Sequence, residues 1–340
     1  MATSATPTPP TPPTPTAPWR VVLRDIFKAP GERQRLANVL GLSVMTLNRW
    51  ANGNTVPQRP HLIRLVQVIP QQYREELLAA LGEMYPDVEV LITDDAPEFI
   101  PTEFCADVLK QRTLLPERMR FGRLSEMILD QMLRQFDPNQ FGMSVTFVQC
   151  MPPSARQNGE ICSLREITGK GTVPWTTDLG QLTLFLGAES LAGYVVERRS
   201  GTSIDDLRKE TLRPAYQVGH EISAAASPIM LGGWIAGCLS VSSTQVGHFS
   251  QQRLQLLNAF SDLSTVIFDR KDFYDPDCIR LRLMPRPDVQ QPIIAEFRQR
   301  VFDARDHRNL SSQEIEQRVW GEIEEEFLNR PPQDYIKKNE

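Results

Sequence analysis

The chain has 340 residues, of which 41% are hydrophobic and 23% are charged, and its formal net charge is −5. This composition is typical of a soluble globular protein, and the length is sufficient for two or three domains. No apolar run reaches the roughly eighteen residues that a membrane span needs, and the first residues lack the pattern of a secretion signal. We therefore expect a cytoplasmic protein without a membrane partner.

The cysteines indicate neither a disulfide framework nor a zinc site. They are odd in number, scattered, and without a C-x-x-C pair, which favours reduced cytoplasmic thiols. We expect no metal and no cofactor. The five are Cys105, Cys150, Cys162, Cys238 and Cys278.

The overall charge hides two regions of opposite sign. Residues 17–70 carry eight Lys or Arg against Asp25 and Glu32, a net charge of +6. The whole chain is −5, so the remainder carries −11. A basic module on an acidic body indicates that only the module meets a polyanion.

The N-terminal part divides into a tail and a helical domain. Residues 1–18 are Pro- and Thr-rich with seven prolines, which predicts a disordered tail. Residues 19–85 show apolar side chains at helical spacing, interrupted by Pro and Gly, which predicts a bundle of short helices. In the stretch "LANVLGLSVMTLNRWANG", residues 36–53, Gly41 permits a left-handed turn and Ser43 can cap the following helix.

This stretch resembles the DNA-binding domain of lambda-repressor and Cro-type regulators, through its run LA-x-x-LG-x-S-x-x-T-x-x-R-W-x-x-G. The resemblance implies a helix-turn-helix whose second helix enters the major groove of duplex DNA. It also implies base contacts from the outward residues of that helix and phosphate contacts from residues flanking it. The base-contact set is Val44, Met45, Thr46 and Arg49, with Asn48 on the same outward face, and the phosphate set is Arg33, Asn54 and, more weakly, Arg59.

Two of these positions depart from the family pattern. Val44 and Met45 stand where polar residues are common in the family, which favours apolar or shape-based recognition. Arg49 can address a guanine in bidentate fashion, and Thr46 a thymine methyl. The competing interpretation is a degenerate helix-turn-helix used only for protein contact, but it leaves the local basic charge without a use.

A mixed α and β region follows a connector at 86–117. Residues 118–272 begin with a helix from Met119 to Phe136, and strands are expected at "MSVTFVQC", "GQLTLFLG", "AAASPIML" and "WIAGCLSVSS". Gly232 and Gly233 between the last two predict a hairpin. Ser250 caps a closing helix, and Gly237 permits close backbone approach in a central strand.

Residues 187–268 resemble a GAF domain, a sensing fold with one antiparallel sheet and helices. The likeness rests on "GAESLAGYVVERRSGTSIDDL" and on "SPIMLGGWIAGCLSVSSTQVGHFSQQRLQLLNAFSDLSTVI". GAF domains bind ligands of several classes or none, and the residues here name no ligand. His220 is interpreted as a surface or capping residue rather than a ligand, and Cys238 as a buried, unreactive thiol.

The final region, residues 273–340, is expected to be a helical extension after a short alternating piece, "CIRLRLM". Ser311 with Glu314 forms a capping box, and Leu310 with Ile315 a hydrophobic staple. The closing helix from Ser250 carries two apolar stripes. We expect one stripe to cover the sheet and the other to meet the 119–136 helix and its copy in a second subunit, although burial of both stripes within one chain remains the alternative.

The sequence thus predicts a multidomain α and α+β protein with an N-terminal all-α helix-turn-helix bundle, a central GAF-like sheet and a helical C-terminal extension. The expected function is transcription regulation by sequence-specific binding of double-stranded DNA, as a homodimer or higher homo-oligomer, with a small molecule or partner as a further ligand. No catalytic motif is present, so we do not expect an enzyme. The alternatives are a GAF-based assembly protein and a thiol-dependent GAF reductase using Cys150, Cys162 and Cys238.

Overall fold

The computed structural model divides the chain into two compact units, Met1–Asp95 and Ala96–Glu340. It describes residues 17–69, 73–82, 84–85, 99–138, 140–153, 155–180, 183–210, 220–304, 311–331 and 334–335. The tail at 1–16 and Leu310 of the expected staple therefore lie outside the described residues. Nowhere in these ranges is a helix both long enough and apolar enough to span a bilayer.

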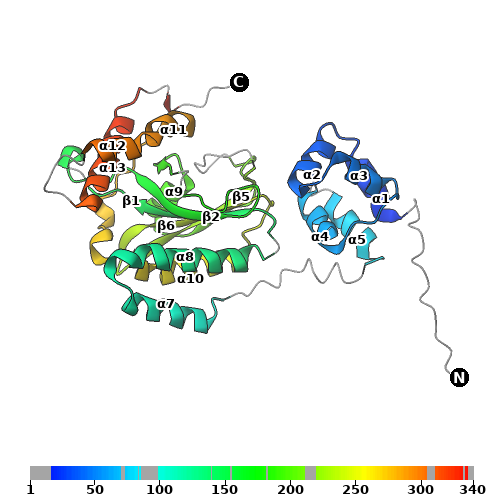
Figure 1. Ribbon diagram of the computed structural model, residues 1–340, viewed down its shortest axis with the longest axis horizontal. Coiled ribbons are helices and arrows are strands. Elements are labelled where there is room, and N and C mark those ends of the chain that lie inside the picture. The colour runs from blue at the N-terminus through cyan, green and yellow to red at the C-terminus, as the bar shows by residue number, and fades with distance from the viewer. Residues whose placement is uncertain are drawn as a thin grey trace. The chain divides into compact units, whose positions relative to one another are not determined.

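The first unit is helical throughout its described elements. Helix α1 packs against α3 and α5, and α2 packs against α3 and α4 (Figure 1). Their inward side chains form one core that includes Trp19, Leu36, Leu47 and Trp50. The elements are α1 (Pro18–Ile26), α2 (Glu32–Leu40), α3 (Val44–Ala51), α4 (Arg59–Val68) and α5 (Arg74–Gly82).

The second unit is built on a curled antiparallel sheet with the strand order β3-β2-β1-β6-β5-β4. The strands are β1 (Met143–Cys150), β2 (Leu164–Gly171), β3 (Phe185–Leu186), β4 (Thr202–Ile204), β5 (Ser223–Leu231) and β6 (Trp234–Ser243). Strands β5 and β6 form the expected hairpin, with Gly232 and Gly233 at positive φ in its turn. At the sheet's centre, a Cβ on Gly237 would lie 2.0 Å from the carbonyl oxygen of Val148, so only glycine fits there.

Helices cover both faces of this sheet. Helix α8 (Glu117–Phe136) packs on β1 and β2, and α10 (Gln251–Ser264) packs on β5, with α7 (Thr102–Leu114) against α8 (Figure 1). Helix α9 (Leu191–Arg198) packs against β5 and β6 within the core of the opposite face. Short 3-10 turns follow α10, at Thr265–Ile267, Arg270–Asp272 and Pro276–Cys278.

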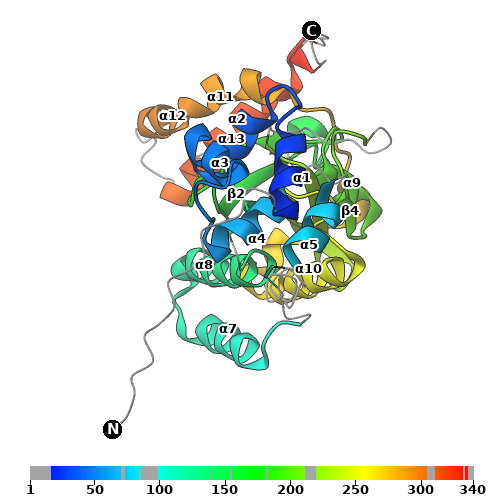
Figure 2. The same cartoon turned by 90° about the vertical axis from the view of Figure 1, so that its right-hand side faces the viewer.

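The C-terminal helices form a further cluster within the same unit. Helices α11 (Pro287–Ala295), α12 (Phe297–Ala304) and α13 (Ser312–Leu328) lie together at one end of it, as Figures 1 and 2 both show. Their apolar residues pack with Met151 and Phe185 of the sheet region. Helix α13 begins with the expected capping box between Ser311 and Glu314.

Several expected elements differ in the structure. Strand β2 was not expected, because its alternation is carried by charged and small residues rather than apolar ones. Helix α9 was not among the expected elements, and it begins at Ser190, which caps it by accepting a hydrogen bond from the N–H of Gly193. In "GQLTLFLG" only Phe185–Leu186 form a strand among the described residues, and "CIRLRLM" forms a single bridge at Ile279.

The two apolar stripes of α10 are both covered within one chain. Leu256 and Phe260 are buried in the core, and so are Leu257, Ser261 and Ser264 of the second stripe. Ser261 donates a hydrogen bond from Oγ to the carbonyl oxygen of Ser227 on β5, at 3.2 Å. Most of the second stripe is therefore covered within the chain, although its Leu254 is half-buried.

Candidate functional site

The connection between α2 and α3 fixes where the third helix starts. Gly41 is left-handed, with φ 65°, and Leu42 N–H donates to the carbonyl of Ala37 at 2.9 Å. Ser43 then caps α3: its Oγ accepts the N–H of Thr46 at 3.1 Å and lies 2.9 Å from Thr46 Oγ1. These two residues act as the sequence predicts, closing one helix and opening the next within three residues.

Helix α3 has a buried face and an exposed face. Leu47, Trp50 and Ala51 are buried in the core of the unit. Met45 is 64% exposed and Arg49 is exposed, so an apolar and a cationic side chain stand on the outer face. Among the described residues, Met45 and Arg49 on this outer face are exposed to solvent.

The other predicted base contacts are less accessible. Thr46 and Asn48 are half-buried, and the hydroxyl of Thr46 already contacts the capping Ser43. Val44 is half-buried as well, and its side chain packs against the core of the helical unit. Arg49 and Met45 are therefore the most available side chains of the predicted set.

The backbone of Arg49 is fixed by hydrogen bonds, while its side chain has no partner among the described residues. Its carbonyl oxygen accepts N–H groups from Asn54 at 2.8 Å and from Thr55 at 3.4 Å, which fixes the chain after α3. Its guanidinium forms no hydrogen bond or ion pair with the described residues. It can therefore bind an external acceptor without first breaking an internal contact.

The predicted phosphate contacts lie on both sides of α3 in sequence. Arg33, near the start of α2, is exposed, and its guanidinium stands 5.1 Å from the ring centre of Phe27. Asn54 is exposed after α3, while the side chain of Arg59 lies outside the described residues. Phe27 lies in the core, as its helical spacing predicts, but its contact with Arg33 was not predicted, because nothing in the sequence relates the end of α1 to the start of α2. Arg35 differs from Arg33, since its guanidinium is paired with Glu32 at 2.7 Å.

The thiols in the second unit sit in poor surroundings for nucleophilic chemistry. Cys150 and Cys238 are buried, and burial raises the pKa of each thiol well above its ordinary value. Burial also raises the pKa of Cys162. A raised pKa disfavours the reactive thiolate. Within the described ranges, no group of three or more His, Cys, Asp or Glu is placed to hold a metal ion.

His220 is half-buried rather than exposed. Its ring meets that of Trp175 edge to face, with centroids 4.5 Å apart, and burial lowers its pKa. Its Nε2 atom is enclosed without a hydrogen-bond partner among the described residues. These contacts explain its position without assigning it a ligand.

Comparison with known proteins gives matches in structure only. No protein-family model and no curated protein matches the chain. A type II free methionine-R-sulfoxide reductase from Thermoplasma acidophilum is 12% identical, covering 47% of this chain and 98% of its own, with a TM-score of 0.34. A GAF domain of an Acinetobacter phosphoenolpyruvate-protein phosphotransferase is 18% identical, covering 48% and 90%, with a TM-score of 0.35.

A third chain of this kind is the GAF domain of the corresponding phosphotransferase from Coxiella burnetii. It is 16% identical, covers 48% of this chain and 90% of its own, and has a TM-score of 0.34. Likenesses of this size do not assign the chain to a family. The curled antiparallel sheet with helices on both faces is the part of the expected GAF architecture that the structure itself shows.

Proposed function

We propose that the protein is a sequence-specific DNA-binding regulator of transcription, whose first unit reads duplex DNA through α3. The observation that carries this proposal is the guanidinium of Arg49, which has no partner among the described residues and stands on the exposed face of a capped helix. It stands in a region with a net charge of +6, on a chain that is otherwise acidic. A basic region of this kind attracts the phosphate backbone.

In this proposal α3 lies in the major groove with its N-terminal end foremost. Arg49 binds a guanine edge with two hydrogen bonds, and Met45 contacts a thymine methyl. The half-buried side chains of α3 extend less far and form the rest of the DNA-binding surface. They are Val44, Thr46 and Asn48. The phosphate contacts come from Arg33, Asn54 and Arg59 and set the orientation of the unit on the duplex.

We further propose that the second unit is a GAF-like domain that holds two copies of the chain together. Helix-turn-helix proteins commonly bind two half-sites about one helical turn apart, which requires a two-fold dimer. Support comes from the surface around α7, where large apolar side chains are exposed to solvent. They are Phe99 at 72%, Leu109 at 52%, Leu114 at 65% and Met119 at 52%.

The test begins with genomic footprinting of the intact protein to find an operator, followed by fluorescence anisotropy on that duplex. Arg49→Ala is expected to weaken binding by roughly ten- to a hundredfold, the loss of one bidentate base contact at about 1–3 kcal/mol. Arg318→Ala is the matched control, because Arg318 is exposed on α13 of the second unit and its ion pair among the described residues is with Glu322. The control is expected to leave the affinity unchanged.

Salt dependence separates this proposal from an assembly protein. Binding through phosphates loses affinity steeply between low and physiological salt, whereas association through apolar surfaces does not. Equal binding by Arg49→Ala and the parent, or binding that ignores salt, would overturn the proposal. Sedimentation of the chain into large complexes without DNA would then favour the assembly function.

A further inference from the structure

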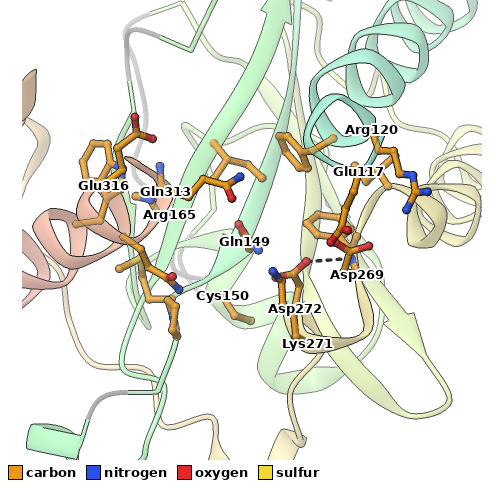
Figure 3. Close-up of a pocket in the computed structure, with 18 of the residues that line it drawn as sticks. Glu117, Arg120, Gln149, Cys150, Arg165, Asp269, Lys271, Asp272, Gln313 and Glu316 are labelled. Atoms are coloured by element: carbon orange, nitrogen blue, oxygen red, sulfur yellow. Dashed lines mark hydrogen bonds between the residues drawn. The ribbon is translucent and has the colours of Figure 1, made fainter. Parts of the chain in front are cut away.

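An open cleft of about 1020 Å³ lies in the second unit, between the start of α8 and helix α13. Residues of β1 and β2 form its base. The start of α8 and the 3-10 turns that follow α10 line one side of it. Figure 3 shows Arg165 and Glu316 on one side, Glu117 and Asp269 on the other, and Gln149 between them. The cleft opens on the sheet face that carries α8, away from the face covered by α9.

Arg165 on β2 is the unusual group in this cleft. Its side chain is half-buried, and its Nε atom is enclosed without a hydrogen-bond partner among the described residues. The guanidinium makes one long hydrogen bond, from Nη1 to the carbonyl oxygen of Glu166 at 3.5 Å, and no ion pair with any described residue. Burial lowers its pKa to about 10, because the charged form is poorly solvated.

Aromatic side chains hold this guanidinium in place. Arg165 lies over the ring of Trp320 from α13, at 4.4 Å from the ring centre. Trp320 is itself stacked on Phe297 of α12, with ring centres 3.9 Å apart and planes 14° from parallel. The indole is thus supported from one helix while it positions the cation on the strand. A fixed guanidinium loses little freedom when it binds a planar anion.

The carboxylates of the cleft do not neutralise Arg165. Asp269 is paired with Arg112 at 3.0 Å, and Asp272 accepts the N–H of Asp269 at 2.9 Å. The negative charge of Glu316 partly offsets the lowering of the pKa of Arg165, but the two groups form no ion pair. Partial burial disfavours the charged guanidinium when no carboxylate is bonded to it, and an anionic ligand would offset that cost.

The lining next to Arg165 is apolar. Ile167, two residues after Arg165 in the chain, lines the same cleft and packs against the core beneath α8. Phe121 of α8 also lines the cleft, and both side chains are half-buried. The cleft volume is at the upper end of the range for small-molecule sites, roughly 300–1,000 Å³.

We propose that this cleft binds a small amphipathic organic anion, with its carboxylate on Arg165 and its apolar part against Ile167 and Phe121. The amides of Gln149 and Gln313 line the same cleft and can accept or donate to further polar groups of the ligand. The site lies wholly in the second unit and does not depend on DNA binding. Its failure and the failure of the proposed DNA contact are therefore separate results.

The test uses isothermal titration calorimetry on the full chain with three probes. 1-Naphthaleneacetate carries both features of the proposed ligand, 1-naphthaleneethanol lacks the charge, and inorganic phosphate lacks the apolar body. We expect the carboxylate to bind at least tenfold more tightly than either of the others. Phosphate binding as tightly as the naphthalene carboxylate would overturn the amphipathic class, and equal binding of the alcohol would overturn the role of the charge.

The variants then test the residues. Arg165→Gln is expected to weaken 1-naphthaleneacetate at least tenfold, with its folding checked by thermal unfolding. Glu316→Gln removes the competing carboxylate and is expected to tighten binding severalfold, whereas Glu322→Gln, on the same helix and paired with Arg318, leaves it unchanged. Opposite signs for Arg165→Gln and Glu316→Gln cannot come from general destabilisation. Absence of binding by the parent chain, or unchanged binding in both variants, would overturn the proposal.

Discussion

In the Ala96–Glu340 unit, the guanidinium of Arg208 lies 2.8 Å from Asp206 and that of Arg318 lies 3.1 Å from Glu322. In the Met1–Asp95 unit, Arg35 is likewise paired with Glu32, whereas Arg33 and Arg49 have no carboxylate partner among the described residues. Exposed ion pairs add little to stability, so the presence or absence of a carboxylate partner matters little for folding. It matters for binding, because the positive charge of an unpaired arginine is not neutralised and can attract a polyanion.

The same comparison isolates Arg165. It is the described arginine of the acidic unit that combines an enclosed nitrogen, an open cleft and no ion pair. Arg112 also has an enclosed nitrogen without a partner, but its other nitrogen is paired with Asp269. Unpaired cations thus mark both proposed binding surfaces, one exposed for a large polyanion and one enclosed for a small anion.

The largest expected effect is a loss of stability in the second unit, while the first unit keeps its stability. Gly237→Ala places a Cβ 2.0 Å from the carbonyl oxygen of Val148, so β1 and β6 must separate. We expect a loss of at least about 3 kcal/mol in the free energy of unfolding. Hydrogen exchange followed by mass spectrometry should show lost protection in the sheet and intact protection at 19–69.

A matched glycine provides the control for that change. A Cβ on Gly321, in α13, meets no atom within 4 Å. Gly321→Ala should therefore stabilise slightly, by up to about 1 kcal/mol, through helix propensity. Parallel loss of protection in both units with Gly237→Ala would contradict their independence.

The next effect concerns a buried carboxyl in the C-terminal helices. Glu324 is 4% exposed, accepts a hydrogen bond from Ser163 Oγ at 2.6 Å, and neighbours Glu325. Burial raises its pKa to about 7, above its ordinary value of 4.5. The protonated form is favoured in the fold, so its stabilising effect is complete below pH 4.5 and is lost as the pH rises through 7.

Glu324→Gln should remove this dependence and keep the hydrogen bond from Ser163. At pH 8 the variant should be more stable than the parent by up to about 3 kcal/mol, and near pH 4 the two should be alike. Urea denaturation at several pH values measures the difference. Glu322→Gln, at an exposed position of the same helix, should follow the parent curve, and an identical curve for Glu324→Gln would refute the assignment.

A smaller effect compares two helix caps, one in each unit. Ser43 caps α3 and Ser311 caps α13, each by accepting a backbone N–H. Replacement of either by Ala should cost about 1 kcal/mol. Unit-resolved hydrogen exchange should place the loss from Ser43→Ala in residues 17–69 and the loss from Ser311→Ala in the C-terminal helices. A loss that crosses between units would show energetic coupling.

The smallest expected effect is on DNA affinity. Arg33→Ala removes one phosphate contact of the proposal, so binding should weaken only severalfold and about equally on all sequences. The slope of log affinity against log salt should fall by about 1. Arg123→Ala, which breaks an exposed pair with Glu126 in the second unit, should change neither quantity. An unaltered slope for Arg33→Ala would remove Arg33 from the interface.

Local signals in the sequence predicted the elements that depend on local physics. Gly41 and Ser43 gave the boundary between α2 and α3, and Ser311 with Glu314 gave the start of α13. The Gly232–Gly233 turn gave the hairpin, because those positions need a positive φ. The outward face of α3 was also predictable, since its spacing decides which side chains point inward.

Features that depend on distant residues could not be predicted. Strand β2 carries Arg165, Glu166 and Lys170 and has no apolar alternation, so it is its pairing with β1 and β3 that makes it a strand. The cleft joins residues from about 116 to 320, and no spacing relates them. The burial of α10's second stripe depended on how β5 and α8 pack.

The carbonyl of Arg49 already accepts two N–H groups from the turn that follows α3. The peptide chain at this point is therefore ordered before any encounter. Only rotation about the side-chain bonds of Arg49 is lost when its guanidinium is immobilised, at most about 2 kcal/mol. Because the backbone of Arg49 is already ordered, its contact with DNA should form without a refolding step. The rate of complex formation is then set by diffusion and orientation.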